Sequence, residues 1–311
     1  MNQTTNTILM IRPVAFRMNE QTAVNNYYQK VLDNLSPKDA NRKAQEEFDA
    51  FVEKLRKVGV NVIVVDDTHI PDTPDSIFPN NWISFHQNGD VILYPMFAEN
   101  RRAERREDIL DIVEDSGFAI ENVTDYTLAE GASMFLEGTG SIVLDRANAK
   151  AYCALSPRAD EELLIEFCED QDMAPIIFHA YQTVNGKREL IYHTNVMMCI
   201  AEKFAVICAD SIDDKQERKL VLDSLKSDDK EVILITEDQV NNFAGNMLEV
   251  RGENNKSYLV MSKSAHQSLT SDQISKIEKY SEILSSSLDV IEACGGGSAR
   301  CMMAEVFLPK I

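Results

Sequence analysis

Short apolar segments, polar turns and amphipathic stretches follow one another in a fixed order along this chain. Residues 81–85 are apolar, residues 87–90 (QNGD) have the composition of a hairpin turn, and residues 91–97 are apolar again. Residues 101–115 carry apolar positions at helical spacing, and residues 118–123 form a further short apolar run. The pattern therefore predicts a unit that consists of a strand, a turn, a strand, a helix and a strand.

This unit recurs three more times toward the C-terminus. Each predicted helix there follows residues that favour an N-cap, namely Ser156-Pro157, Ser211 or Ser271-Asp272. The predicted elements of the second unit are 141–144, 150–155, 159–170 and 174–180, those of the third are 195–200, 204–209, 213–226 and 231–236, and those of the fourth are 246–250, 257–262, 271–285 and 288–293.

A fifth unit is divided between the two ends of the chain. Residues 301–308 supply its first strand, residues 7–13 its second, residues 41–58 its helix and residues 60–66 its last strand. Pairing of the two terminal strands would close the repeats into a ring without free sheet edges. We therefore expect an α/β fold in which residues 1–311 form a single domain.

The spacing of the repeats indicates which residues meet in space. Successive units start 57, 56, 51 and 56 residues apart, at Asn81, Gly138, Thr194, Gly245 and Cys301. In a radial fold, equivalent positions lie near the axis. We therefore expect a single site built from side chains at or next to these starts: Asn81, Glu137, His193, Asn195 and Cys301.

Composition and charge exclude several classes of partner. The chain has 31 Lys+Arg and 51 Asp+Glu among its 311 residues, a formal net charge of −20. This balance nearly rules out a nucleic-acid-binding protein, because contacts with phosphates need clustered cations. No apolar run approaches the roughly 18 residues of a membrane span, and residues 1–7 do not resemble a signal peptide. We expect a cytoplasmic protein that acts on a small molecule, and homo-oligomer formation stays open.

Cys301 stands out among six cysteines that otherwise show no C-x-x-C pair and no Cys/His cluster. The other five are predicted to be buried thiols. Cys301 follows Gly295-Gly296-Gly297-Ser298, and glycines let the backbone approach a ligand closely. The neighbouring Arg300 favours a thiolate, while Ser298 suits a turn and a ligand contact equally. We interpret Cys301 as a nucleophile, the alternative being a core thiol that opens a strand.

Two further residues at repeat starts have acid–base chemistry. An unperturbed histidine such as His193 titrates near neutral pH and can carry protons there. Glu137 can orient a protonated nitrogen of this histidine or of a substrate. The alternatives are a structural histidine and a turn-capping carboxylate. No phosphate-binding loop and no metal motif accompanies them, so we expect neither a cofactor nor a metal.

Four short motifs together resemble the guanidino-group-modifying enzymes, which include arginine deiminase, dimethylarginine dimethylaminohydrolase and the amidinotransferases. The resemblance covers residues 8–308 and is strongest to the bacterial citrulline-hydrolysing, amidinotransferase-like branch. It implies a five-bladed α/β propeller (pentein) of ββαβ repeats with pseudo-fivefold symmetry, with Cys301 as nucleophile, His193 as general acid/base and Glu137 as acidic partner. The motifs are FPNNW (78–82), EGTG (137–140), YHTN (192–195) and GGGSARCM (295–302).

The chain departs from arginine deiminases at Asn81 and Asn195, where those enzymes carry aspartates that hold the guanidinium. A guanidinium has only N–H donors, whereas a ureido group is neutral and has a carbonyl oxygen that needs a donor. Asparagine offers both a donor and an acceptor, so the two differences favour a ureido substrate such as citrulline. The alternative is that both asparagines merely bond to the backbone in turns.

Two arginines are candidates for binding a substrate α-carboxylate. Arg158 lies in Ser156-Pro157-Arg158, which resembles the Ser-x-Arg of deiminases, and Arg101 opens an Arg-x-x-Glu sequence. The alternative for Arg101 is a place on a solvated helical face within residues 101–108. Residues 68–77 and 182–189 are candidate loops that close the site.

The sequence favours a hydrolase that cleaves a C–N bond of L-citrulline through a covalent cysteine intermediate. The products would be ornithine, ammonia and carbon dioxide. One alternative is a deiminase-type hydrolase of arginine or methylarginine, or an amidinotransferase. A remoter alternative is a non-catalytic module that binds an amino acid.

Overall fold

Five three-stranded sheets account for most strands in the computed structural model, which describes residues 2–30, 32 and 35–311. In each sheet the first strand pairs antiparallel with the second, and the second pairs parallel with the third. The sheets are β17 (Ala304–Glu305), β1 (Thr7–Arg12) and β2 (Asn61–Asp66); β3 (Ile83–Phe85), β4 (Asp90–Leu93) and β5 (Asn122–Asp125); β6 (Ile142–Asp145), β7 (Lys150–Ala154) and β8 (Ala174–Phe178); β11 (Met198–Ile200), β12 (Phe204–Ile207) and β13 (Glu231–Leu234); and β14 (Leu248–Arg251), β15 (Ser257–Ser262) and β16 (Glu282–Ser286).

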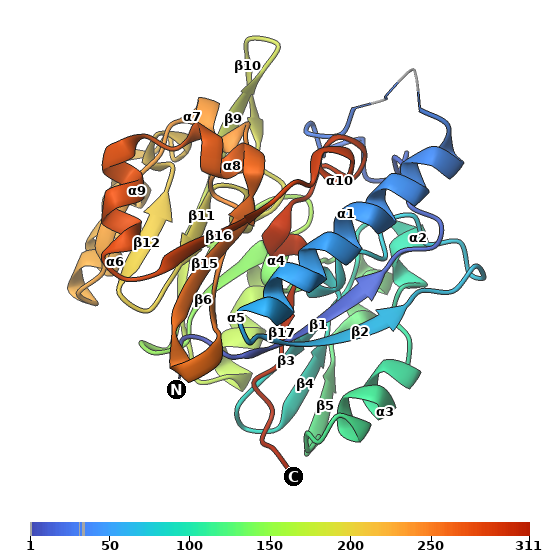
Figure 1. Cartoon of the computed structure of the whole chain (residues 1–311). Coiled ribbons are helices and arrows are strands. Elements are labelled where there is room, and N and C mark those ends of the chain that lie inside the picture. Colours follow the sequence, from blue (N-terminus) through green and yellow to red (C-terminus); the bar gives the residue numbers. More distant parts are fainter. Residues whose placement is uncertain (1, 31, 33–34) are drawn as a thin grey trace.

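Helices connect the second and third strands of these sheets, because parallel neighbours need a crossover connection. Figure 1 shows α3, α6 and α9 at the periphery and α1 across the front of the view, with β3, β6 and β17 nearer the middle. The α-helices are α1 (Pro37–Lys57), α2 (Glu99–Arg102), α3 (Asp108–Asp115), α4 (Gly138–Ser141), α5 (Glu161–Asp170), α6 (Lys215–Ser227), α7 (Glu237–Val240), α8 (Lys263–Ser268), α9 (Ser271–Glu278) and α10 (Asp289–Gly295).

Pairing of the two chain ends completes the first sheet, as the sequence predicts. Ile8 lies opposite Glu305 and Leu9 opposite Ala304 in the antiparallel pair of β1 with β17. The other edge of β1 pairs in parallel with β2. First strands of neighbouring sheets also touch, β17 against β3, β6 against β11 and β11 against β14. The polar groups of β1 are therefore satisfied by β2 along one edge and, near the start of the strand, by β17 from the far end of the chain along the other.

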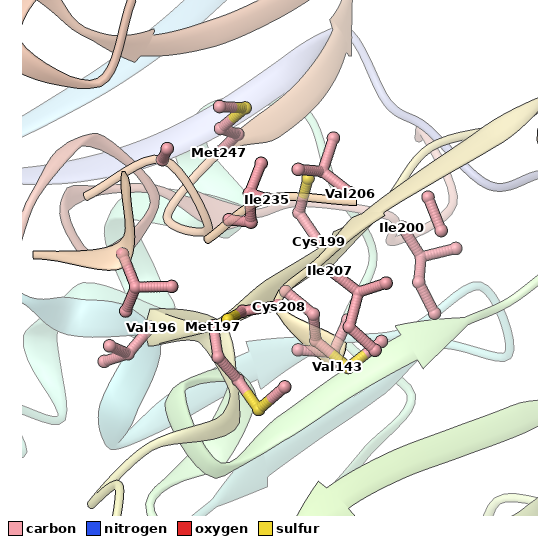
Figure 2. Close-up of a cluster of buried hydrophobic side chains, with 14 of the residues drawn as sticks. Val143, Val196, Met197, Cys199, Ile200, Val206, Ile207, Cys208, Ile235 and Met247 are labelled. Atoms are coloured by element: carbon pink, nitrogen blue, oxygen red, sulfur yellow. The ribbon is translucent and has the colours of Figure 1, made fainter. Parts of the chain in front are cut away.

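Apolar side chains fill the space between the sheets and their helices. Figure 2 shows one such cluster, in which Val206 and Ile207 of β12 lie with Cys199, Ile200 and other side chains. The second strand of four sheets is buried along most of its length, and β4 at two of its four residues, which is typical of strands covered on both faces. Burial of these second strands fixes the position of the first strands that pair with them.

The boundaries of the fourth unit differ from the sequence prediction. The predicted helix over residues 271–285 ends at Glu278, and Glu282–Ser286 forms β16, which pairs in parallel with β15. The predicted strand at 288–293 is wrong, because these residues belong to the approach to α10 and to α10 itself. Ile274, Ile277 and Leu284 have helical spacing, so the pattern favoured one long helix and the pairing with β15 overrode it.

Other elements also differ from the prediction. Residues 101–115 form two helices, α2 and α3, separated by residues 103–107. The strand predicted at 118–123 is β5, four residues further on. Residues expected to form a loop at 182–189 belong largely to a hairpin of β9 (Tyr181–Val184) and β10 (Lys187–Leu190), which projects at the top of Figure 1.

The three predicted N-caps also differ from the observed ones: Ser156-Pro157 and Ser211 lie three or more residues too early, and Ser271-Asp272 lies inside the helix. The observed caps are Asp160, Asp214 and Thr270, whose side chains accept hydrogen bonds from the first helical N–H groups. Each stands directly before its helix, where a side-chain oxygen can reach these donors.

Among the described residues, none of the helices combines the length and the apolar character that crossing a bilayer requires.

Candidate active site

One small chamber brings together residues from the starts of several sheets. Cys301 lies in a 3₁₀ turn at Ala299–Met302, His193 directly precedes the turn Thr194–Val196, and Asn81 ends the turn Pro79–Asn81. The chamber is nearly closed, with a free volume of about 10 Å³ for the centre of a water-sized sphere. Its lining is Thr22, Asn26, Asp75, Phe78, Asn81, Arg101, Arg158, Tyr192, His193, Gly295, Gly297 and Cys301.

Glu137 lies behind His193 as its hydrogen-bond partner. The distance from His193 Nε2 to Glu137 Oε2 is 2.7 Å, and both side chains are buried. A carboxylate only accepts, so Nε2 carries the proton and Nδ1 is left unprotonated. His193 can therefore take or give a proton at Nδ1.

The charges of this pair are set by burial and by two arginines. Burial disfavours the Glu137 carboxylate, but the nearby Arg158 and the hydrogen bond from His193 outweigh it and lower the pKa of Glu137 to about 2. Burial lowers the pKa of His193 to about 4, and the hydrogen bond to Glu137 offsets this only in part. At neutral pH, Glu137 is therefore ionised and His193 is neutral.

Two asparagine side chains contact the sulfur of Cys301. Asn195 Nδ2 lies 3.6 Å from Sγ, and Asn246 Nδ2 lies 3.3 Å from it. Asn195 also donates to the carbonyl oxygen of Thr139. Asn246 is a site residue that the sequence analysis missed, although the repeat spacing points to the neighbouring Gly245 as the start of the fourth unit.

Arg101 fixes the orientation of the Asn81 amide. Its Nη1 donates to Asn81 Oδ1 over 2.8 Å, and since an arginine can only donate, the oxygen end of the amide faces Arg101. Asn81 Nδ2 donates to Asn80 Oδ1 over 3.1 Å, which uses one of its two hydrogens. The second hydrogen of this amide is available to the chamber.

Both arginines of the chamber are buried and already hold protein groups. Arg101 forms a two-pronged ion pair with Glu104, with both N–O distances at 2.9 Å, which excludes the solvated helical face considered for it. Arg158 donates to Asn25 Oδ1, to the Thr22 carbonyl oxygen and to Glu137 Oε2. Each therefore needs to share or exchange a hydrogen-bond partner before it can bind a carboxylate.

A segment that precedes α1 covers the chamber. Asn26 donates to the carbonyl oxygens of Gly295 and Gly296, and Gln29 donates to that of Gly295. Thr22 and Asn26 face the chamber directly. Residues 19–29 thus cover the site. Of the two loops that the sequence favoured for this role, residues 68–77 contribute Asp75 to the lining, whereas no residue of 182–189 lines the chamber.

Asp75 lines the chamber, and the sequence analysis missed it. Its Oδ2 accepts from Asn19 Nδ2 and Thr22 Oγ1, while its Oδ1 is buried without a hydrogen-bond partner among the described residues. Burial raises the pKa of Asp75. The position six residues before Asn81, inside a predicted loop, carried no pattern that singled it out.

Two residues beside Cys301 do not face the chamber. Ser298 Oγ donates to Glu292 Oε1 over 2.6 Å, so this side chain supports the turn and does not line the site. Arg300 donates to the Met303 carbonyl oxygen and to Glu305, both over 2.8 Å. The expectation that Arg300 favours the thiolate is therefore wrong, because ion pairing with Glu305 directs its guanidinium elsewhere.

Gly140 permits the close approach of two functional atoms. A Cβ at this position would lie 2.4 Å from Asn81 Nδ2 and 2.8 Å from His193 Nδ1. Both distances are too short for a real side chain, so glycine is required for this packing.

The described residues contain no group of three or more His, Cys, Asp or Glu side chains that could hold a metal ion.

Solved structures with similar folds include enzymes of guanidino compounds. The crystal structure of ArgZ, an arginine dihydrolase from cyanobacteria, matches 98% of this chain and 41% of its own, with a TM-score of 0.74 and 16% identity. Unliganded AgrE matches 98% of this chain and 40% of its own, with a TM-score of 0.73 and 17% identity. This chain thus spans about two fifths of the length of either protein.

A third structure matches almost end to end. It is a histidine-to-glycine variant of dimethylarginine dimethylaminohydrolase, as an adduct with S-methyl-L-thiocitrulline. The match covers 96% of this chain and 98% of that one, with a TM-score of 0.64 and 14% identity. Identities this low establish the α/β fold only. Comparison with curated protein sequences gives no significant match.

The sequence itself matches a family profile from residue 12 to residue 308. This range contains every residue of the chamber and all five sheets except the first residues of β1. The chain therefore belongs to the family described as N,N dimethylarginine dimethylhydrolase, eukaryotic.

Proposed function

We propose that this protein is a cysteine hydrolase that cleaves a C–N bond of L-citrulline and releases ornithine, ammonia and carbon dioxide. The carrying observation is the orientation of the Asn81 amide. Because Arg101 holds its oxygen, Asn81 presents an N–H group to the chamber. A ureido oxygen accepts such a donor, whereas a guanidinium offers only donors and would face it unpaired.

The charges near the nucleophile also support a neutral substrate group. Glu137 Oε2 contacts His193, Arg158 and Arg101, at 2.7, 3.4 and 4.0 Å, and its Oε1 accepts from the Phe97 N–H. The charge of this carboxylate is therefore already balanced by two arginines. A guanidinium in the same place would meet two arginines, which is electrostatically unfavourable.

The opposite charges of an amino acid have counterparts in the chamber. Asp75 has an unpartnered buried oxygen that can accept from an α-ammonium group. Arg101 and Arg158 supply cations for an α-carboxylate, with Arg158 exchanging its contacts to Thr22 and Asn25. A zwitterion with a neutral side chain therefore balances the charges of this site.

The proposed reaction uses Cys301 and His193, which both line the chamber. The Cys301 thiol gives its proton to His193 Nδ1, and the thiolate attacks the ureido carbon while Asn81 binds the ureido oxygen. The C–N bond to the terminal nitrogen breaks, His193 returns the proton to this nitrogen, and ammonia leaves. Water activated by His193 then cleaves the S–C bond, and the resulting N-carboxyornithine separates into ornithine and carbon dioxide.

We also propose the larger arrangement that this site implies. The five sheets form a five-bladed propeller with pseudo-fivefold symmetry, and residues 1–311 act as one catalytic domain in the cytoplasm. Asn81, Glu137, His193, Asn195 and Cys301 meet near the axis of that propeller. Asn195 supports the sulfur, and no cofactor takes part.

Family membership favours a second candidate, a hydrolase of arginine or a methylarginine. The family name contains dimethylarginine, and the similar structures include an arginine dihydrolase. In this case the products from arginine would be citrulline or ornithine with ammonia. Transfer of the amidino group to an acceptor amine belongs to the same chemistry.

The test measures ammonia, carbon dioxide and amino-acid products after separate incubation with L-citrulline, L-arginine and N,N-dimethylarginine. Ornithine and carbon dioxide from citrulline, with the other two untouched, is the expected result. Turnover of arginine or dimethylarginine but not citrulline would refute the ureido assignment. The inactive control is Cys301→Ala, which should lose all measurable turnover and keep its fold.

A further variant tests the carrying observation itself. Asn81→Asp replaces the free N–H donor by an acceptor and adds a negative charge beside Arg101. We expect turnover of citrulline to fall by at least about tenfold, since a lost hydrogen bond to a reacting group costs about 1–3 kcal/mol. Unchanged citrulline turnover in this variant would show that Asn81 does not bind the ureido oxygen.

A further inference from the structure

Asn246 makes the shortest polar contact with the Cys301 sulfur among the described residues. Its Nδ2 lies 3.3 Å from Sγ, compared with 3.6 Å for Asn195 Nδ2. The side chain is almost fully buried, with 1% of its surface exposed. A buried amide at this distance interacts with the sulfur without competition from bulk water.

The protein backbone determines which end of the Asn246 amide faces the sulfur. The N–H of Arg300 donates to Asn246 Oδ1 over 3.0 Å, and a backbone N–H can only bond to the oxygen end. One hydrogen of Nδ2 then points to the Asn195 carbonyl oxygen, 3.1 Å away. The other hydrogen is directed at Cys301 Sγ, so Asn246 acts as a donor to the sulfur.

Packing holds this donor in place. Met247, the next residue, is buried in the hydrophobic cluster of Figure 2, together with Val196 and Met197, which follow Asn195. Gly245 lets the two segments touch, because a Cβ there would lie 2.3 Å from the Val196 carbonyl oxygen. The two amides that contact Cys301 are therefore anchored by one common core.

The charged groups around the site do not replace this donor. Arg300 is paired with Glu305, and His193 is neutral because burial lowers its pKa to about 4. The other titratable groups that line the chamber are Asp75, Arg101, Arg158 and Tyr192, and Glu137 lies behind His193. Both arginines are held by carboxylate or amide oxygens of the protein.

We propose that Asn246 is a catalytic residue whose amide donates a hydrogen bond to the Cys301 thiolate and so stabilises the attacking form of the nucleophile. This inference rests on the proposed role of Cys301. It matters most for a neutral substrate, since citrulline brings no positive charge of its own to the thiolate. No bond of Asn246 forms or breaks: the proton of the thiol passes to His193, and the sulfur accepts the amide hydrogen.

The test follows alkylation of Cys301 by iodoacetamide between pH 5 and 10, without substrate, by mass spectrometry of the peptide that contains Cys301. The variants are Asn246→Ala, which removes the donor, and Asn246→Asp, which keeps the shape and the bond from Arg300 but places negative charge near the sulfur. Asn242→Asp is the matched control. It adds the same charge in the same connection, where the side chain is exposed and donates to Asp238.

The midpoint of the alkylation rate against pH should be lower in the wild type than in either Asn246 variant. We expect it to move upward by about one pH unit in Asn246→Ala and further in Asn246→Asp, because the lost hydrogen bond stabilises the charged thiolate and not the thiol. The alkylation rate at pH 7 falls about tenfold or more, while the plateau rate at high pH is unchanged. Asn242→Asp should follow the wild-type profile.

Unchanged midpoints in both Asn246 variants would overturn the proposal. A lower plateau with an unchanged midpoint would also overturn it, because that result describes a displaced sulfur and a purely structural role. If Asn246→Asp fails to fold, Asn246→Ala decides by the same two criteria. No substrate is used, so the test can support the role of Asn246 even if the protein does not hydrolyse citrulline. Failure of the Asn246 proposal is therefore distinguishable from failure of the proposed function.

Discussion

Two buried histidines of this protein have different environments. His193 bonds through Nε2 to the Glu137 carboxylate and faces the chamber with the rest of its ring. His86, which directly follows β3, bonds through Nε2 to Ser84 Oγ over 2.8 Å, and its Nδ1 lies 3.4 Å from Arg146 Nη1. Ser84 also bonds to the Tyr94 hydroxyl over 2.7 Å. One ring therefore has an anionic partner, and the other has a hydroxyl and a cation.

Burial has the same electrostatic effect on both rings. It lowers the pKa of His193 to about 4 and that of His86 well below its ordinary value, where Arg146 contributes a second, smaller lowering. The difference lies in the partners. His193 has a carboxylate that can stabilise a proton taken up at Nδ1, whereas His86 has a cation beside Nδ1. A perturbed pKa alone therefore does not identify an acid–base residue.

Replacing each histidine by asparagine tests this comparison with the largest expected effect. His193→Asn removes the proton carrier, and we expect turnover to fall by at least about 10³-fold. His86→Asn should retain turnover within about a factor of three and lose about 1–3 kcal/mol of unfolding free energy, since buried hydrogen bonds are broken. Steady-state kinetics and urea unfolding of both variants check this. Equal losses of activity would remove the distinction between the two sites.

Glu137→Gln makes His193 resemble His86 by removing its carboxylate. The glutamine amide can donate to Nε2, which favours the wrong ring tautomer, and Arg158 loses a negative partner. We expect kcat to fall about 10²-fold and the melting temperature to decrease. Both are measured on the purified variant. A variant with wild-type kcat would show that the carboxylate is not needed for proton transfer.

Gly140→Ala disturbs the approach of Asn81 to His193 without changing a functional group. The new Cβ would lie 2.4 Å from Asn81 Nδ2, so both side chains must move, and misplaced groups lower the rate steeply. We expect about a tenfold loss of kcat. Gly131→Ala is the control, because its Cβ would have no neighbour within 4 Å. Similar kinetics of the two variants would contradict the close packing of the chamber.

The smallest effect concerns acid stability. Both histidines have a lower pKa in the folded state than the ordinary value of 6.5, so the unfolded chain binds protons first as the pH falls. Above pH 6.5 both rings are neutral in the folded and the unfolded chain. Below pH 6.5 the rings take up protons only in the unfolded chain, which lowers the free energy of unfolding. Between about pH 7 and 5.5, His86→Asn should therefore lose about 1 kcal/mol less unfolding free energy than the wild type. Urea unfolding at the two pH values measures this difference, and equal losses would refute a neutral His86 in the folded state.

The sequence predicted the repeated units because each depends on local information. Apolar runs around polar turns predict β6 and β7, and the order of the repeats places the two terminal strands in one sheet. Family membership agrees with motifs that surround Cys301 and His193. These features depend on periodicity and on glycine-rich segments, which the chain carries in consecutive residues.

Only the tertiary structure decided features that depend on distant neighbours. Pairing with β15 turned residues 282–286 from a predicted helix into β16, and burial against Asn81 and Glu104 took Arg101 from a surface helix into the chamber. The contact of Asn246 with Cys301 joins residues 55 positions apart. Local pattern specifies which elements form, but hydrogen bonds and charges across the chamber depend on where separate units meet, and no stretch of sequence contains those distances.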